Sequence, residues 1–306
     1  MASHLQKTLE EIIEFKGVGL HSGVEGNLRL KPAEPNSGIK FKRTDIDSDK
    51  NIIEANYKNV ISPILCTKIQ NSHGVSVSTI EHLMAAFYLE GVDNALVELD
   101  APEVPILDGS AFDFAHAIKS FGIKEQNDPR KFIKVLKKVE VNNGVKKISI
   151  EPLSKDLVID FEIVYNNPLI RTRRKEFKLS KSDLNPITDS RTFCLYEDID
   201  KIRSQGLAKG GSLENAIVVK DQKILNDDGL RYRDEFVNHK ILDCIGDLML
   251  SGHRIFGHIK TSQGGHQLTN ALLREFFSDE SNWEFENFED KDDKHGKYSK
   301  SIAVNA

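Results

Sequence analysis

The segment from Asp234 to Leu250 constrains the fold most, because it has the length and pattern of a helix that is apolar on most sides. At about 100° per residue, His239, Asp243 and Asp247 fall in one quadrant of this helix. Lys240 lies at the margin of that quadrant. Apolar residues occupy most of the remaining circumference: Phe236, Val237, Ile241, Leu242, Ile245, Leu248, Met249 and Leu250. Such a helix is buried, so we expect its polar quadrant to face the protein interior.

Two carboxylates and an imidazole on a buried helix face need partners, because an isolated ionised carboxylate costs many kcal/mol in a low-dielectric interior. A divalent metal ion is one such partner. The alternative is that the quadrant is a narrow solvated face, as on most amphipathic helices. The helix alone does not distinguish the two interpretations.

A second helix, expected from Thr79 to Glu90, has the same apolar character. Only Glu81 and His82 are polar before its last residue. Its apolar residues are Ile80, Leu83, Met84, Ala85, Ala86, Phe87, Tyr88 and Leu89. The segment that begins at Ser78 also fits a capping box, in which the Glu81 side chain reaches back to the Ser78 amide. Taken alone, this helix favours the capping box over a functional role for Glu81.

Together, the two helices carry the residues of a catalytic zinc site: two histidines and a carboxylate as ligands, with a spare glutamate and a spare aspartate. Three protein ligands leave zinc a fourth position for water, whose pKa the metal lowers to about 7, and the spare glutamate can accept its proton. His239 and Asp243, at i and i+4, can reach one ion from one helix face. His82 would approach from the other domain.

Two glycine-containing segments have both a functional and an ordinary interpretation. His266 follows a strand pattern and two glycines that allow close approach of the backbone. A lone loop histidine is usually a surface residue, but here it would supply a proton donor for a leaving amine. The segment from Gly206 to Ser212 resembles a phosphate-binding loop, yet it lacks the lysine that a P-loop needs after the final glycine. It is equally compatible with a plain loop.

The 306 residues are enough for two domains of ordinary size. We expect the boundary near Asn127, in the polar stretch from Lys124 to Arg130, which gives an N-terminal domain of residues 1–127 and a C-terminal domain of residues 128–306. The mixed order of strand and helix patterns favours an α+β fold.

The acid-rich chain from Ser278 to Ala306 is expected to be a frayed tail. Further expected elements are strands near residues 24–30, 94–99, 132–141, 147–150 and 157–165, and a helix at residues 111–121 capped by Ser110.

Charge and hydropathy restrict the partners of the chain. The chain has 42 basic and 47 acidic side chains and a net charge of -5, so it lacks the excess of positive charge that binding a polyanion requires. We therefore expect no nucleic acid partner. No window approaches the roughly 18 consecutive apolar residues of a membrane helix, and we expect a soluble, cytoplasmic protein. The three cysteines are too few and too far apart for a disulfide framework or a cysteine-rich zinc site.

In their joint order, the motifs resemble the UDP-3-O-acyl-N-acetylglucosamine deacetylase family across nearly the whole chain, from Gly17 to about Asn270. No single motif would suffice, and the order of all of them carries the resemblance. The matching stretches are residues 17–23 (GVGLHSG), 65–67 (LCT), 78–83 (STIEHL), 101–110 (APEVPILDGS), 191–193 (RTF), 206–212 (GLAKGGS), 226–231 (NDDGLR) and 239–247 (HKILDCIGD).

The resemblance implies one zinc ion per chain and a set of catalytic residues. The implied zinc ligands are His82, His239 and Asp243. Glu81 would act as the general base and His266 as the general acid. Asp247 would orient and charge His266, and Thr192 would donate a hydrogen bond to the oxyanion.

The resemblance also implies substrate contacts. Lys240 and Phe193 match positions near the sugar and diphosphate, and Tyr165 would stack on the uracil. The passage for the 3-O-acyl chain would be lined by Leu195, Ile199, Ile202 and Leu207. The remaining implied substrate-binding residues are Leu65, Cys66, Gly211 and Ser212. The sequence departs from the family pattern at Gln263, where a basic residue is expected, and at Val164, where an acidic residue often precedes an aromatic one.

The family fold would consist of two similar α+β domains, each with a helix pair packed on β-sheet, and with the active site at their junction. The implied substrate is UDP-3-O-(3-hydroxyacyl)-N-acetylglucosamine, the implied products are acetate and the free amine, and the implied source is a Gram-negative type of bacterium. We expect a monomer. Two alternatives stay open: a zinc amidase for another N-acyl substrate, and a non-catalytic module that binds nucleotide sugars around a structural zinc.

Overall fold

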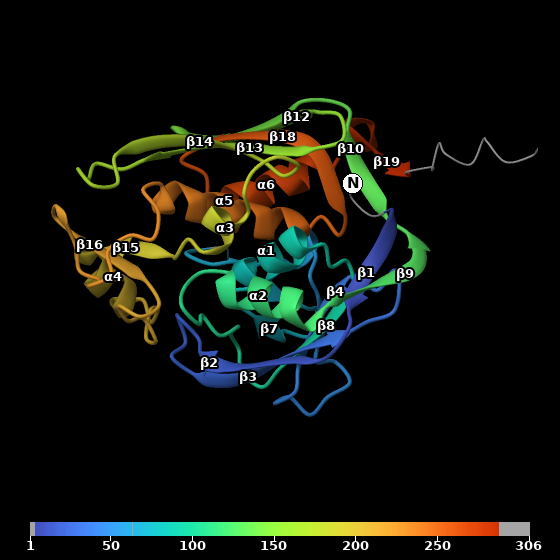
Figure 1. Cartoon of the computed structure of the whole chain (residues 1–306), viewed down its shortest axis with the longest axis horizontal. Helices are drawn as coiled ribbons and strands as arrows, with labels where there is room; N and C mark the ends of the chain where they lie inside the picture. The colour runs from blue at the N-terminus through green and yellow to red at the C-terminus, as the bar shows by residue number, and fades with distance from the viewer. Residues whose placement is uncertain (1–3, 63, 288–306) are drawn as a thin grey trace, which may run out of the picture.

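The computed structural model describes residues 4–62 and 64–287, which form sheets on the outside and helices between them (Figure 1). The helices α1 (Glu81–Glu90) and α2 (Phe112–Phe121) lie against a sheet of the N-terminal half. The helices α5 (Glu235–Met249) and α6 (His266–Phe276) lie against a sheet of the C-terminal half. The two helix pairs face each other, with α1 against α5. The predicted α+β class is therefore confirmed.

Within the described residues, the N-terminal sheet has the strand order β2-β3-β8-β4-β5. The pairs β2-β3, β3-β8 and β4-β5 are antiparallel, and β4-β8 is parallel. Strand β3 alternates between buried and exposed residues, so that Leu28 and Leu30 face the core. The bounds of these strands are β2 (Ile13–Val18), β3 (Glu25–Pro32), β4 (Ile39–Arg43), β5 (Ile52–Glu54) and β8 (Ala95–Leu99), and a short pair is formed by β6 (Ile69–Gln70) and β7 (Ser76–Val77).

The C-terminal sheet runs β11-β12-β18-β10-β19 in the part of the chain that the structure describes, and β13 also pairs with β18 and with β14. Helices α5 and α6 cover one of its faces (Figure 1). Its strands are β10 (Lys131–Val135), β11 (Val139–Asn143), β12 (Lys146–Pro152), β13 (Leu157–Val164), β14 (Thr172–Lys178), β18 (Arg254–Ser262) and β19 (Trp283–Asn287).

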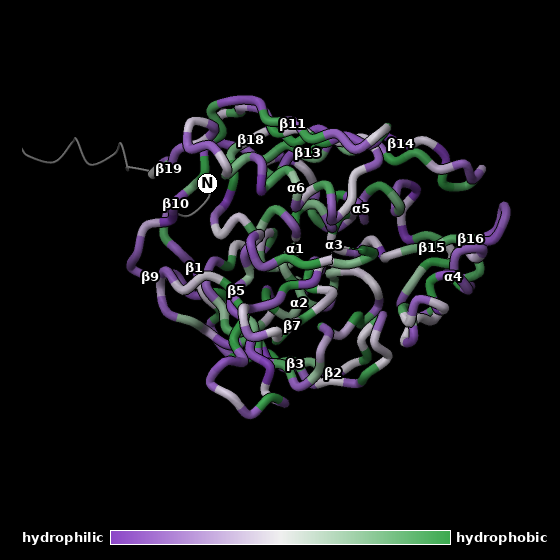
Figure 2. The backbone as a smooth tube through the Cα atoms, turned by 180° about the vertical axis from the view of Figure 1, so that it is seen from behind, coloured by the Kyte–Doolittle hydropathy of each residue, from purple (hydrophilic) through white to green (hydrophobic). Residues whose placement is uncertain are grey.

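A smaller unit projects from the C-terminal half, between β14 and α5 (Figure 1). It contains a sheet in the order β15-β16-β17, and hydrophobic residues recur along it (Figure 2). Its elements are β15 (Phe193–Leu195), η2 (Tyr196–Asp198), α4 (Ile199–Ser204), β16 (Ile217–Lys220) and β17 (Lys223–Ile224). The short helix α3 (Asn185–Thr188) precedes this unit in the chain and lies against α5 and α2 (Figure 1). Two further short helices in residues 4–62 and 64–287 are η1 (Tyr57–Asn59) and η3 (Glu280–Asn282).

The polar stretch around Asn127, in which we expect the domain boundary, forms β9 (Ile123–Pro129), which pairs with β1 (Leu5–Leu9), because backbone pairing does not require apolar side chains. One expectation about the secondary structure needs correction. The tail expected to fray from Ser278 onward starts with η3 and β19, and β19 pairs antiparallel with β10. Residues 288–306 of that predicted tail lie outside the described residues.

The contact between α1 and α5 positions the site. Helix α1 is buried at every residue except Glu90, and α5 is buried at every residue except Lys240. A Cβ atom at Gly246 would clash with the backbone carbonyl of Glu81, so glycine at this position lets the two helices approach closely. In the described part of the chain, no helix is long and apolar enough to cross a membrane.

Candidate active site

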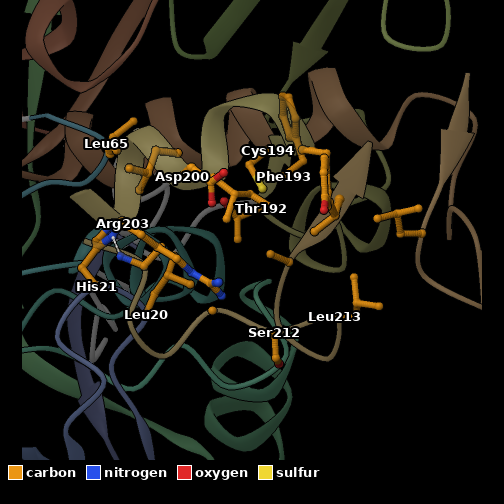
Figure 3. Close-up of a pocket in the computed structure, with 18 residues that line it drawn as sticks. Leu20, His21, Leu65, Thr192, Phe193, Cys194, Asp200, Arg203, Ser212 and Leu213 are labelled. Atoms are coloured by element: carbon orange, nitrogen blue, oxygen red, sulfur yellow. Dashed lines mark hydrogen bonds between the residues drawn. The ribbon is translucent and has the colours of Figure 1, made fainter. Parts of the chain in front are cut away.

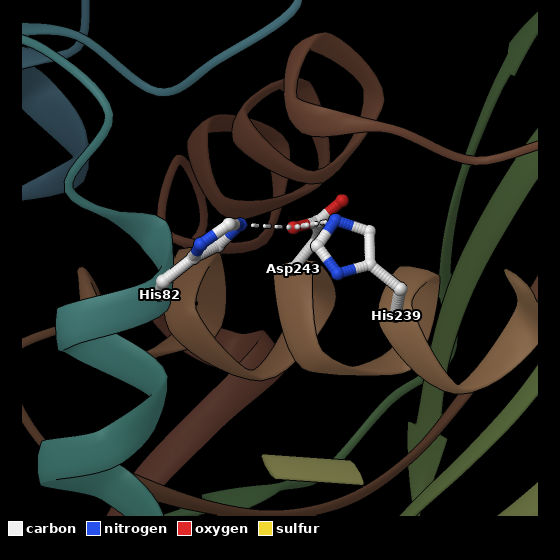
Figure 4. Close-up of side chains that lie close together, drawn as sticks. All are labelled: His82, His239 and Asp243. Carbon is white, nitrogen blue, oxygen red and sulfur yellow. Dashed lines mark ion pairs between the residues drawn. The ribbon is translucent and has the colours of Figure 1, made fainter. Parts of the chain in front are cut away.

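His82, His239 and Asp243 converge where α1 crosses α5 (Figure 4). Oδ1 of Asp243 lies 3.5 Å from Nε2 of His82 and 3.4 Å from Nε2 of His239. The two imidazole rings stand nearly perpendicular, with centroids 5.0 Å apart. One donor atom from each residue can therefore be chosen so that all three lie within 4.8 Å of one another. The polar quadrant predicted for α5 is buried, and the solvated-face alternative is wrong.

These three side chains fit a divalent metal ion. Oδ1 of Asp243 is buried and has no hydrogen-bond partner among the described residues. Burying an unpaired carboxylate oxygen costs free energy unless a cation binds to it. Nδ1 of His239 lies 3.0 Å from the carbonyl oxygen of Ser190, which can only accept, so the proton is on Nδ1 and the lone pair of Nε2 faces the cluster. Such a hydrogen bond on the far nitrogen is typical of metal-binding histidines.

The protonation states of His239 and Asp243 also suit a metal. Burial lowers the pKa of His239 to about 3, so the imidazole is neutral at pH 7. Burial favours the neutral form of Asp243, but His239 in its protonated form and the Lys240 ammonium outweigh it and hold the pKa of Asp243 well below its usual range. Nζ of Lys240 lies 2.9 Å from Oδ2 of Asp243. Neutral imidazoles and an ionised carboxylate are the forms that bind metal ions.

Glu81 is the first residue of α1 and does not form the expected capping box. Thr79, just before the helix, has a φ of 56°, so the backbone does not continue the helix toward Ser78. The Ser78 amide donates to the carbonyl oxygen of Pro102 and not to Glu81. Oε2 of Glu81 accepts from the Thr67 amide at 3.0 Å. Burial raises the pKa of Glu81. The carboxylate is thus held beside His82 and is not used to cap the helix.

His266 begins α6 and is buried, so it is not a surface loop histidine. Its Nδ1 lies 2.9 Å from Oδ2 of Asp247, and its Nε2 lies 3.7 Å from Oε1 of Glu81. Burial lowers the pKa of His266, but Asp247 and Glu81 outweigh burial and raise the pKa to about 10. A protonated imidazole and a carboxylate therefore stand next to the three candidate ligands.

Figure 3 shows a cavity of about 430 Å³ that is lined in part by Phe193. The Phe193 ring centroid lies 6.3 Å from that of His239, so the cavity is next to this centre. Its walls come from the projecting unit of β15, α4 and β16, from the loop after β2, and from Leu65 in the segment before β6. Most of the side chains are apolar: Leu20, Leu65, Phe193, Cys194, Tyr196, Ile199, Ile202, Ala208, Leu213, Ala216, Val218 and Leu225, with His21, Thr192, Asp200, Arg203, Gly211 and Ser212 completing the wall. An aliphatic chain suits such a cavity.

The structure brings together most, but not all, of the residues expected to contact substrate. Those in the cavity wall are Leu65, Thr192, Phe193, Ile199, Ile202, Gly211 and Ser212. Three expected residues do not line the cavity: Leu195, Leu207 and Cys66. Leu195 packs against the main hydrophobic core. Tyr165 and Lys240 flank Phe193, with the Tyr165 ring centroid 5.7 Å and the Lys240 ammonium 5.6 Å from the Phe193 ring.

Sequence reasoning missed several residues that the structure places at the centre. Thr67 lies in a matched motif but received no role, although it contacts Glu81, Asp247 and His266. Ser190 contacts His239 through its backbone carbonyl, and a pattern of side chains in the sequence cannot predict such a contact. His21 and Leu20 line the cavity. Both lie in the matched stretch of residues 17–23, which could have indicated a place at the site.

The comparisons with known proteins agree with this geometry. A family model described as UDP-3-O-acyl N-acetylglycosamine deacetylase matches residues 6–278. Proteins named UDP-3-O-acyl-N-acetylglucosamine deacetylase from Actinobacillus pleuropneumoniae serotype 3 and Haemophilus influenzae are 44% and 43% identical to this chain over 290 residues, and one from Aliivibrio fischeri is 42% identical over 289 residues. Each alignment covers 94% of both chains. The chain therefore belongs to the family of UDP-3-O-acyl-N-acetylglucosamine deacetylases, which are metalloenzymes.

Proposed function

We propose that this protein hydrolyses the N-acetyl group of UDP-3-O-(3-hydroxyacyl)-N-acetylglucosamine, a step of lipid A biosynthesis that releases acetate and a free amine. Family membership supports the deacetylase activity. The observation that carries the proposal is the pair formed by Glu81 and His266, 3.7 Å apart beside three candidate metal ligands. A metal ion with a purely structural role would not need a proton acceptor and a proton donor beside it.

His82, His239 and Asp243 would hold one zinc ion per chain. Two imidazoles and a carboxylate are a common ligand set for catalytic zinc, which keeps one position open. When bound there, the metal would polarise the acetyl carbonyl and lower the pKa of water. The orphaned Oδ1 of Asp243 supports this assignment.

The acid and base roles follow from the hydrogen bonds of each group. Glu81 would accept a proton from the attacking water, with its Oε2 fixed by the Thr67 amide. His266 would donate the proton of Nε2 to the departing nitrogen, and Asp247 on Nδ1 keeps the ring charged and oriented. The Thr192 hydroxyl would donate to the oxyanion that forms on the acetyl carbonyl.

The apolar cavity would take the 3-O-acyl chain. Its lining residues Ile199 and Ile202 support this use, because they face a space that no other part of the described chain fills. The sugar and diphosphate would lie along Phe193 and Lys240, and Tyr165 would stack on the uracil. Leu65, Gly211 and Ser212 would contribute to the wall.

The remaining expectations stay proposals. We propose that residues 1–127 and 128–306 are two domains with the site at their junction, that the protein works as a cytoplasmic monomer, and that it binds no nucleic acid. The net charge of -5 supports the last point.

Acetate release from the acylated substrate tests the proposed reaction. Glu81→Gln and His266→Ala should each lower kcat by about 100-fold or more, the scale of a lost general base or acid, while the bound metal stays. A substrate without the 3-O-acyl chain should react much more slowly. Equal turnover with and without that chain would favour an amidase for another N-acyl substrate. No acetate release from any of these substrates would favour a non-catalytic binding module.

A further inference from the structure

Thr67 joins the two halves of the proposed acid and base machinery. Its side chain is 2% exposed, and it precedes β6 in a segment where the Thr67 carbonyl accepts from the amide of Ile80, just before α1. Its amide donates to Oε2 of Glu81 at 3.0 Å. Its hydroxyl contacts Oδ1 of Asp247 at 2.5 Å and Nδ1 of His266 at 3.1 Å. One residue therefore contacts both proton-transfer groups and the carboxylate behind one of them.

The direction of these hydrogen bonds follows from what each atom can donate. A threonine hydroxyl has a single proton, and the Asp247 carboxylate can only accept it. The hydroxyl oxygen then presents a lone pair to Nδ1 of His266, which must carry a proton for that contact and for its 2.9 Å hydrogen bond to Oδ2 of Asp247. The Nδ1 proton is thus shared between two acceptors that are themselves hydrogen-bonded.

This arrangement fixes both the imidazole of His266 and the carboxyl group of Glu81. Two acceptors on Nδ1 restrict rotation of the ring, so that Nε2 points to the side of Glu81 and Asp243, at 3.7 and 3.9 Å from their carboxylate oxygens. The Thr67 amide fixes the opposite partner, because it occupies Oε2 of Glu81 and leaves Oε1 facing His266. The relative placement of acid and base therefore depends on one buried residue.

We propose that Thr67 is a positioning residue that sets the orientation of His266 through Asp247 and aligns it with Glu81. This inference rests on the proposed deacetylase function. The hydroxyl, not the bulk of the side chain, carries the effect on His266. The amide contact to Glu81 remains in any variant that keeps the backbone.

Thr67→Val and Thr67→Ser separate the hydroxyl from the packing. Valine keeps the shape and removes the hydroxyl, and serine keeps the hydroxyl and removes the methyl group. Thr67→Val should lower kcat by about 10- to 100-fold, the scale of lost hydrogen bonds behind catalytic ligands, with KM and metal content unchanged. Thr67→Ser should keep most of the wild-type kcat. A loss in both variants, or a loss confined to KM, would overturn the proposal.

Thr8→Val is the matched control, because Thr8 is also a buried threonine whose hydroxyl makes two hydrogen bonds, here to the Asn94 carbonyl and the Ala33 amide. It should cost stability and leave kcat unchanged. A double variant of Thr67→Val with Asp247→Asn should lose less than the product of the single effects, because both act on His266. Independent effects would show that Thr67 does not act through Asp247.

A readout without substrate separates this inference from the proposed reaction. The NMR resonance of the Nδ1 proton of His266 should shift in Thr67→Val and stay in place in Thr8→Val. If the wild-type protein released no acetate but this shift were present, the proposed function would fail and the positioning would stand. An unshifted resonance in an active enzyme would overturn the role of Thr67 alone.

Discussion

Nδ1 of His266 and Oδ2 of Asp247 lie 2.9 Å apart in a buried site. The pair joins the start of α6 to the last turn of α5, so the packing of these helices sets the orientation of the imidazole. Because the aspartate favours the charged ring, the pKa of His266 rises to about 10 despite burial. A histidine with this pKa stays a proton donor throughout the neutral range.

The rate should therefore depend on pH through His266. The acid form must be present, so kcat/KM should fall as pH rises through the raised pKa, well above the usual histidine value of about 6.5. Asp247→Asn removes the charge that contributes most to raising this pKa, and the basic limb should move to lower pH. The pH profiles of wild type and variant measure the shift. A basic limb that stays in place in Asp247→Asn would contradict the pairing.

His266→Ala provides the control for that assignment. Loss of the ring should erase the basic limb along with most of kcat. If the variant kept measurable activity and an unchanged basic limb, another group would be the titrating acid.

The metal content should follow the three ligands. Alanine at His82, His239 or Asp243 should lower zinc per chain together with the rate, because each residue supplies one of three protein donors. Elemental analysis of the purified variants measures this. His116→Ala is a suitable control, since His116 stacks on Phe112 in α2 and lies outside the cluster. Full zinc occupancy in His82→Ala would exclude His82 as a necessary ligand.

Chain-length selectivity should respond to bulk in the cavity wall. Ile199→Phe shortens the space beside α4, so it should raise KM for long acyl chains more than for short ones. Leu195→Phe is the comparison, because Leu195 packs against the core and does not line the cavity as described. Steady-state kinetics with a series of acyl lengths measures the difference. An equal loss for all lengths in Ile199→Phe would indicate ordinary core packing at this position.

Gly246→Ala should destabilise the protein even though it lies inside a helix. Helix propensity alone would make alanine more stable by about 1 kcal/mol. The new methyl group would clash with the Glu81 carbonyl, and overpacking of this kind costs about 1 to 3 kcal/mol. Urea unfolding gives the sign of the change. A more stable variant with normal kcat would show that α1 and α5 do not need this close approach.

The sequence predicted the chemistry of the site better than its boundaries. The polar quadrant of α5 was recognisable because period and hydropathy fix which residues share a helix face, and His239, Asp243 and Asp247 are all buried as expected. The capping box was wrong because its four-residue motif does not include Thr67, 14 residues before Glu81, whose amide donates the hydrogen bond to the Glu81 side chain.

The strands β9 and β19 were missed for a related reason. β9 is polar along most of its length and shows no apolar pattern, yet its backbone pairs with β1. In β19, Trp283 and Phe285 alternate with glutamates, but this short pattern stands at the start of an acid-rich stretch, and its backbone pairs with β10. The cavity wall was predicted in part, because the family resemblance implied an acyl passage that includes Ile199 and Ile202. Which of its apolar residues face the cavity depends on how β15 and α4 pack, and this separates Ile199 from Leu195.

Acetate release by metal-free protein tests the central claim most directly. The wild-type protein is treated with a chelator, freed of the chelate, and assayed with UDP-3-O-(3-hydroxyacyl)-N-acetylglucosamine before and after one equivalent of zinc is added back. We expect activity to disappear with the metal and to return with zinc, and we expect zinc to restore no activity in Asp243→Ala. Acetate release at the original rate by the metal-free protein would contradict it.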